Sequence, residues 1–260
     1  MPRFAANLSM LFTEVEMTSR FKLAAQAGFR GVEMLFPYDW PVTELANLLR
    51  QNGLEQVLFN LPPGDWNAGE RGIASLPGRE AAFCAGVEQA LDYANALGCR
   101  QLHCMAGRRD TQFSASDQRR LLIENVRYAA RAAAAHGITI NIEAINSRVD
   151  MPGYLVDDVP SALQLIEAVG EPNVRFQFDV HHLQVIQGDL LRTLERLLPV
   201  IGHVQFADNP GRHEPGTGEI YFDRVFGRLD ELGYTGWVSA EYRPSASTAE
   251  SLHWLPRASG

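Results

Sequence analysis

Polar side chains stand at the ends of four apolar runs in the second half of the chain. Each run alternates apolar and polar residues, and the four end on Glu143, Asp179, Gln205 and Glu241. Successive side chains of a strand point to opposite faces, so the polar members of each run share one face. In a closed parallel barrel that face points inward, away from the helices. We therefore expect three carboxylates and an amide to meet at one rim of a barrel.

Such a cluster suits proton transfer between carbon atoms. Carboxylates in a narrow, desolvated cup repel one another, so protons or a cation must compensate. Oxygen ligands favour Mg²⁺ or Mn²⁺ over Zn²⁺. A cation that held a hydroxy-carbonyl pair would stabilise an enediolate, while one glutamate removes a proton and another returns one. We expect Glu143 and Glu241 in those roles and Asp179 and Gln205 chiefly as ligands, with dependence on a metal left open.

Four basic or titratable side chains are candidates for binding the substrate. His182 follows Asp179 by three residues and could hydrogen-bond a substrate oxygen or orient a ligand, although a lone histidine is as often structural. Arg71, Arg212 and Arg243 fall on segments that should reach the same rim, and each could bind a substrate carboxylate or be a solvated surface side chain. We expect Arg71 and Arg243 to be better placed than Arg212.

A repeated alternation of helix and strand supplies the frame for these residues. Seven glycines follow helix-like stretches and precede apolar runs, as expected where a helix ends in the left-handed conformation: Gly28, Gly53, Gly98, Gly137, Gly170, Gly202 and Gly233. The runs predict strands at residues 4–8, 32–36, 56–60, 101–105, 139–145, 174–180, 203–207 and 237–242, with helices at 15–27, 43–51, 80–97, 114–136, 159–169, 190–200 and 221–232. Eight such units predict one (β/α)₈ barrel domain over residues 1–260.

Two connections are longer than the rest. Residues 62–79 follow the third predicted strand and residues 208–219 follow the seventh, so both should lie at the carboxyl ends of the strands. Loops of this length are usually functional, although flexible surface loops are the alternative. Residues 245–260 suggest a short closing helix and a frayed tail.

Composition excludes several classes of function. The 260 residues include 23 Lys plus Arg and 31 Asp plus Glu, a net charge of −8 without a basic run, which argues against nucleic acid binding. No apolar stretch is long enough for a membrane span or a signal peptide, so we expect a cytosolic protein. The odd cysteine count, with Cys84, Cys99 and Cys104, favours reduced thiols. Exposed Trp66 and Ile73 could serve a homo-oligomer.

The chain resembles the hydroxypyruvate isomerase family of xylose isomerase-like TIM barrels along nearly its whole length. The resemblance implies conversion of hydroxypyruvate to 2-hydroxy-3-oxopropanoate (tartronate semialdehyde), with Glu143 and Glu241 as the proton donor and acceptor. It also implies that Glu143, Asp179, Gln205 and Glu241 match the metal ligands of the superfamily. The segments that carry it are residues 4–12, 31–38, 60–66, 68–73, 76–80, 207–210, 213–220 and 241–242.

Departures from related families bear on the substrate. Sugar epimerases of the superfamily commonly have His in place of Gln205 and a Glu near residues 148–150, and both differences favour a small acid over a free hexose. The family usually has Lys where Arg243 stands, which keeps the charge but changes its geometry. A 2-oxotetronate isomerase or related sugar-acid isomerase or epimerase, and a non-catalytic sugar-acid binding barrel, remain alternatives. An endonuclease IV-like repair enzyme would need a histidine-rich zinc cluster and a basic surface, which this sequence lacks.

Overall fold

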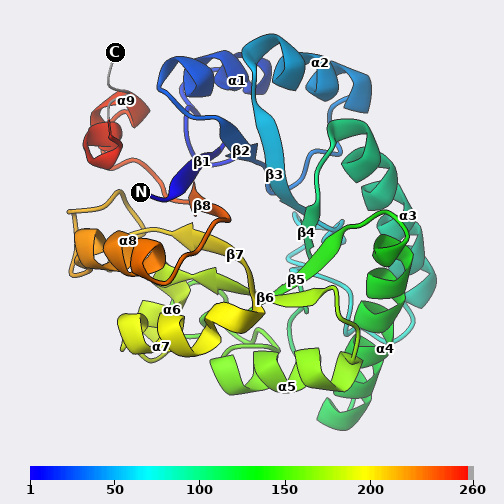
Figure 1. Ribbon diagram of the computed structural model, residues 1–260. Helices are drawn as coiled ribbons and strands as arrows, with labels where there is room; N and C mark the ends of the chain where they lie inside the picture. Colours follow the sequence, from blue (N-terminus) through cyan, green and yellow to red (C-terminus); the bar gives the residue numbers. More distant parts are fainter. Residues whose placement is uncertain (257–260) are drawn as a thin grey trace.

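The computed structural model describes residues 1–256 and shows a closed barrel of eight parallel strands (Figure 1). Each strand pairs with its neighbour in sequence, and β1 pairs with β8 to close the barrel. The strands are β1 (Arg3–Asn7), β2 (Gly31–Glu33), β3 (Glu55–Asn60), β4 (Gln101–His103), β5 (Thr139–Glu143), β6 (Val174–Asp179), β7 (Ile201–Phe206) and β8 (Trp237–Ala240). The predicted (β/α)₈ architecture is confirmed, and every predicted strand is present.

Helices surround the barrel and cover the outer faces of its strands (Figure 1). They are α1 (Met17–Gln26), α2 (Val42–Asn52), α3 (Glu80–Leu97), α4 (Ala115–Ala134), α5 (Val159–Val169), α6 (Val180–Ile186), α7 (Leu190–Leu197), α8 (Phe222–Glu231) and α9 (Thr248–Ser251), with 3₁₀ turns η1 (Leu198–Val200) and η2 (Leu252–Trp254). Helix α6 is an addition to the predicted set, because β6 ends at Asp179, whose side chain caps the next helix. No helix in residues 1–256 is long and apolar enough to cross a membrane.

The two faces of the strands differ as predicted. The apolar face is turned toward the outer layer, and its side chains have exposed fractions of 1% or less: Ile140, Ile142, Phe176 and Phe178. Inward-facing polar side chains are equally buried and hydrogen-bond one another across the barrel, as Gln177 does with Gln205. The acids Glu143 and Asp179 lie on this polar inner face, at the carboxyl ends of β5 and β6.

Six of the seven predicted glycine joints have the left-handed backbone expected of them. Gly202 is the exception, since β7 begins at Ile201 and includes it. A Cβ atom at this position would lie 2.7 Å from Cβ of Arg175 and would also collide with the amide of Asn141. Gly202 therefore gives neighbouring side chains room inside the sheet instead of ending a helix.

The two long connections lie where the sequence predicts them. Residues 61–79 join β3 to α3, and residues 207–221 join β7 to α8. The predicted closing helix is α9 with η2, and the expected frayed tail extends into residues 257–260, which lie outside the described residues. Both connections contribute to one cavity at the carboxyl ends of the strands.

Candidate active site

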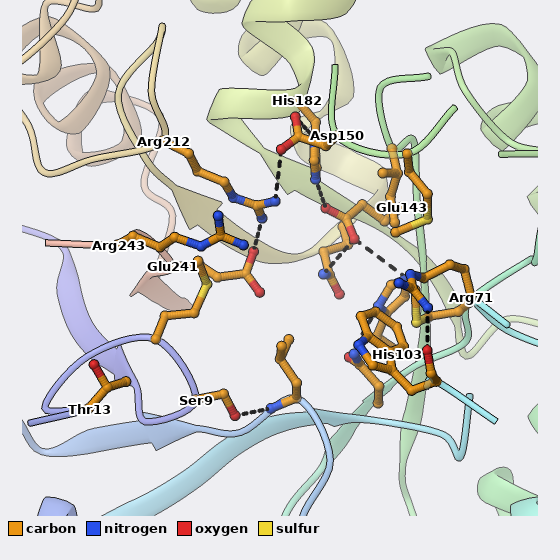
Figure 2. Close-up of a pocket in the computed structure, with 18 of the residues that line it drawn as sticks. Ser9, Thr13, Arg71, His103, Glu143, Asp150, His182, Arg212, Glu241 and Arg243 are labelled. Carbon is orange, nitrogen blue, oxygen red and sulfur yellow. Dashed lines mark hydrogen bonds and ion pairs between the residues drawn. The ribbon is translucent and has the colours of Figure 1, made fainter. Parts of the chain in front are cut away.

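A cavity of about 700 Å³ opens at this end of the barrel (Figure 2). Six of the eight predicted site residues line it: Arg71, Glu143, His182, Arg212, Glu241 and Arg243. Asp179 and Gln205 lie directly beside these residues, within hydrogen-bond or ion-pair distance of them or of Gln177. The structure thus brings together side chains from β5, β6, β7, α6 and the connections that follow β3, β7 and β8.

Glu143 ends β5 and points into the cavity with a 5% exposed fraction. Its Oε2 accepts a hydrogen bond of 3.3 Å from Gln177 Nε2, whereas Oε1 has no hydrogen-bond partner among residues 1–256. Burial, together with the charges of Asp179 and Glu241, raises the pKa of Glu143 well above its usual range. The carboxyl group is therefore ready to hold a proton.

Glu241 follows β8 and faces Glu143 across the cavity (Figure 2). Arg212 donates a hydrogen bond of 2.6 Å to Oε2, and Asn7 donates one of 3.2 Å to Oε1. Burial raises the pKa of Glu241 to about 8, although the charge of Arg212 opposes the shift. Both glutamates thus have raised pKa values, as a pair that exchanges protons with carbon requires.

Arg212 is the internal counter-charge of the acid cluster. Its guanidinium lies 2.6 Å from Glu241, 3.5 Å from Asp179 and 3.6 Å from Asp150. Burial works against ionisation of Asp150, yet hydrogen bonds from His181 and Asn146 and the charge of Arg212 lower its pKa. From the sequence we expect Arg71 and Arg243 to be better placed than Arg212 to bind the substrate. In the structure, Arg212 is the arginine that contacts the acids.

Asp179 fixes both histidines that follow it. Its Oδ1 accepts hydrogen bonds from the backbone N–H groups of His181 at 2.7 Å and His182 at 3.3 Å, which starts α6. Burial opposes ionisation of Asp179, but His182 and Arg212 lower its pKa. Because the strand stops here, His181 also turns toward the site, and its Nε2 lies 3.1 Å from Asp150. A continued strand would have pointed His181 away.

Gln205 lies beneath the cavity with both ends of its amide engaged. Its Oε1 accepts from Gln177 at 2.6 Å, and its Nε2 donates to Glu33 at 2.8 Å. Glu33 is fully buried at the end of β2 and also accepts from Asn7 and His203, both at 3.0 Å. Glu33 connects the floor of the barrel to Glu241 through the shared donor Asn7.

Three cavity or floor residues escape the sequence reasoning: Glu33, His103 and Asp150. Strands β2 and β4 have only three residues each, too few for alternation to reveal Glu33 or His103. Asp150 lies in the connection after β5, where no strand periodicity exists. Its position within residues 148–150, a stretch that the resemblance to sugar epimerases singles out, is the one available signal.

The donor atoms fit a divalent cation. One atom each from Glu143, Asp179 and His182 lies within 4.8 Å of the others, and the unpartnered Oε1 of Glu143 is buried beside them. Two carboxylates and one imidazole at this spacing could hold a metal ion. Of the predicted ligands, Glu143 and Asp179 converge here, while Glu241 pairs with Arg212 and Gln205 is hydrogen-bonded below.

The remaining arginines border the mouth of the cavity. The Arg71 guanidinium stacks 3.8 Å above the ring of Trp66 and donates hydrogen bonds to backbone oxygens of Trp66 and Glu70. Arg243 also lines the cavity, and its backbone N–H donates to the carbonyl of Arg212 at 2.9 Å. Neither side chain forms an ion pair with an acid in residues 1–256, so their charges remain available to an anion.

Known proteins resemble the chain over its whole length. The family model described as xylose isomerase-like TIM barrel matches residues 21–258. The hydroxypyruvate isomerase of Escherichia coli (strain K12) is 47% identical and the 2-oxo-tetronate isomerase of Cupriavidus necator 48% identical, each match covering 98% of both chains. A crystal structure of an AP endonuclease, family 2, from Brucella melitensis is 48% identical over 98% of both chains, with a TM-score of 0.95.

A more distant structure, the 3-keto-D-glucoside 4-epimerase from Escherichia coli, shares 20% of its residues at a TM-score of 0.78 and shows the fold alone. The nearer relatives cover almost all of this chain and of their own. The chain is therefore an isomerase and belongs to the hydroxypyruvate isomerase family of xylose isomerase-like TIM barrels.

Proposed function

We propose that this enzyme converts hydroxypyruvate to 2-hydroxy-3-oxopropanoate. The observation that carries the proposal is the pair of buried glutamates, Glu143 and Glu241, that face one cavity bordered by arginines. The relative named hydroxypyruvate isomerase supports it at 47% identity. The substrate class is thus a short 2-oxo acid with a neighbouring hydroxyl group.

The reaction moves one proton between adjacent carbons and one between their oxygens. A glutamate takes a proton from the hydroxyl-bearing carbon, the C–H electrons form the double bond of the enediolate, and the carbonyl π electrons move to their oxygen. That oxygen takes the proton that the hydroxyl oxygen releases, and the other glutamate gives a proton to the former carbonyl carbon. Burial and the repulsion of neighbouring acids raise the pKa values of Glu143 and Glu241, so one carboxyl group can be protonated while the other is ionised. The ionised group accepts a proton from carbon, and the protonated group donates one. Atoms and charge therefore balance without an oxidant or reductant.

A divalent cation, Mg²⁺ or Mn²⁺, would be held by Glu143 and Asp179, the two ligands implied by the family resemblance that converge with His182. The other two implied ligands are engaged elsewhere, because Glu241 pairs with Arg212 and Gln205 bonds to Gln177 and Glu33. When bound, it supplies positive charge beside the two substrate oxygens. His182 lies 3.7 Å from both Glu143 and Asp179 and would orient these carboxylates or donate to a substrate oxygen.

We assign the substrate carboxylate to Arg71 and Arg243. Both line the cavity, and neither is paired with an acid of the cluster. Arg212 is the third candidate, but its charge already balances Asp150, Asp179 and Glu241. We therefore propose that Arg212 aligns Glu241 and reaches the substrate from the side of its hydroxyl and carbonyl groups.

The second candidate substrate is 2-oxotetronate, a longer acid. The cavity volume of about 700 Å³ offers more room than a three-carbon acid fills, and a 2-oxo-tetronate isomerase is 48% identical to this chain. Comparing kcat/KM for the two acids decides between them, because the better substrate has the larger value. The expectations of a cytosolic location and of a homo-oligomer stay predictions, but of the two apolar residues expected to be exposed, only Trp66 is exposed and Ile73 is buried.

The decisive experiment follows 2-hydroxy-3-oxopropanoate formation from hydroxypyruvate with wild type, Glu143→Gln and Glu241→Gln. Loss of either proton-transfer group should lower kcat by about 10²- to 10⁴-fold. The matched control is Glu44→Gln, which alters an exposed glutamate on α2 and should leave kcat unchanged. Robust activity in both site variants would contradict the two-glutamate mechanism.

Two further arms of the assay separate the alternatives. Full activity after thorough chelation would remove the cation from the mechanism but leave the glutamates. A non-catalytic sugar-acid binding barrel would bind the acids without turnover. An endonuclease activity is disfavoured by the acid-lined cavity and the net charge of −8, which repel a DNA backbone.

A further inference from the structure

His103 presents a buried nitrogen atom to the cavity that nothing in the described structure satisfies. The residue ends β4, is 2% exposed and lines the cavity opposite Arg212 (Figure 2). Among residues 1–256, its Nε2 atom has no hydrogen-bond partner. A buried polar atom without a partner is costly, so its retention at a substrate cavity points to a ligand that supplies one.

The chemical character of this nitrogen follows from its other neighbour. His103 Nδ1 lies 3.2 Å from Oδ1 of Asn60, the residue beside it in the β3–β4 pair. An amide oxygen only accepts hydrogen bonds, so Nδ1 carries the hydrogen and Nε2 presents a lone pair. Asn60 is itself held at its backbone, where its carbonyl accepts from the Tyr38 hydroxyl at 2.6 Å.

A second acceptor faces the same space. Oε2 of Glu143 lies 3.6 Å from His103 Nε2. The distance is too long for a hydrogen bond between them, so the buried Nε2 atom stays without a partner until a hydrogen-bond donor enters from the cavity. The hydroxyl group of a hydroxy acid is such a donor and sits on the carbon that must exchange a proton.

We infer that His103 is a further substrate-binding residue whose Nε2 atom accepts a hydrogen bond from the substrate hydroxyl, next to the carbon served by Glu143. The inference rests on the proposed function. It makes His103 a specificity residue, because an acid of the same shape that lacks the hydroxyl leaves Nε2 unsatisfied.

Calorimetric binding of two acids tests this assignment. Hydroxypyruvate and pyruvate differ only in the hydroxyl group, and the Glu241→Gln background with Mg²⁺ present stops conversion during the titration. In this background we expect hydroxypyruvate to bind about tenfold more tightly than pyruvate. His103→Asn, which can keep the contact with Asn60 but is too short to replace Nε2, should bring that ratio close to one.

Two companion variants complete the experiment. His103→Gln can place an amide oxygen near the position of Nε2 and should retain part of the preference. His136→Gln alters an exposed histidine at the start of the α4–β5 connection and should retain all of it. Thermal melting of each variant verifies that it is folded.

The outcomes distinguish the inference from the function on which it rests. If His103→Asn weakens both acids equally, the histidine is merely structural and the inference is wrong, while the proposed function stands. A failure of the background protein to bind either acid overturns both. If His103→Asn does not fold, His103→Gln decides the question. If that variant binds both acids equally more weakly, so that the ratio of their affinities is unchanged, the assignment is also wrong.

Discussion

At the scale of single residues, the charge of the acid cluster is only partly balanced by Arg212. Burial works against the charge of Arg212, yet Glu241 and Asp179 raise its pKa, so it stays protonated at any working pH. One guanidinium does not neutralise Glu143, Asp150, Asp179 and Glu241 together. The residual repulsion appears in the raised pKa values of both glutamates.

These raised pKa values predict that the metal-free protein loses stability in mild alkali. The pKa of Glu241 is about 8 in the folded state against an ordinary 4.5, so at pH 7 the folded protein holds a proton that the unfolded chain has released. Raising the pH to about 8.5 removes it and should cost about 1 kcal/mol, or about 2 to 4 °C in melting temperature. Scanning calorimetry in chelator measures the change.

The pH range and a variant isolate this effect. Burial lowers the pKa values of His103 and His182 to about 3, so both favour folding as the pH rises toward their ordinary value of 6.5 and add little above it. Glu241→Gln should flatten the slope between about pH 7 and 8.5. An unchanged slope in that variant would show that another group causes the loss.

The position of a residue in the barrel is predictable where a strand is long enough to show its two faces. Strands β5 and β6 have five and six residues, and their alternation identifies Glu143 and Asp179. Glu33 and His103 stand at the ends of three-residue strands, where one or two polar positions are indistinguishable from loop residues. The hydrogen-bond partner of such a residue depends on how the barrel closes. Glu33 on β2, for example, bonds to His203 on β7.

At the scale of elements, the connection from β7 to α8 is held around a single carboxylate. Asp208 is fully buried and accepts hydrogen bonds of 2.8 to 3.1 Å from the backbone N–H groups of Asn209, Gly216, Gly218 and Ile220. Arg212 lies within the loop so formed and reaches the acids from it. The long loop is therefore a fixed support for Arg212, not a flexible surface segment.

Asp208→Asn should loosen this support. One of the two acceptor oxygens becomes a donor, so some of the four amides lose their partner, at a cost of about 1 to 3 kcal/mol in the free energy of unfolding. Hydrogen exchange at residues 216, 218 and 220 should accelerate, and kcat/KM should fall by about 10- to 100-fold because Arg212 is displaced.

The matched control is Asp223→Asn, an exposed acid in the first turn of α8 just beyond the loop. It should leave both hydrogen exchange in the loop and kcat/KM unchanged. Faster exchange without loss of activity in Asp208→Asn would mean that Arg212 keeps its place without the clamp.

At the scale of the whole molecule, the first and last elements of the described chain are in contact. Strands β1 and β8 pair, and Thr248 of α9 contacts the connection after β1. Its Oγ1 accepts from the backbone N–H of Phe12 at 2.7 Å and donates to Glu14 at 3.0 Å. Phe12 has a left-handed φ of 60°, and Glu14 lines the cavity, so this contact shapes the cavity wall.

Thr248→Val should therefore destabilise the molecule although the two side chains have nearly the same shape. The buried N–H of Phe12 loses its acceptor, at an expected cost of about 1 to 3 kcal/mol. Urea denaturation measures it as a lower midpoint. Thr111→Val, at an exposed position, should leave the midpoint unchanged, and equal midpoints for all three proteins would show that the contact adds nothing to stability.

The position of Arg212 along the chain also has a consequence for how the protein is made. Synthesis proceeds from the amino terminus, so Glu143 and Asp179 emerge before Arg212, and Glu241 emerges after it. The guanidinium has thus left the ribosome before the last acid of the cluster joins the barrel with β8. A nascent chain never has to gather all of these negative charges before their counter-charge exists.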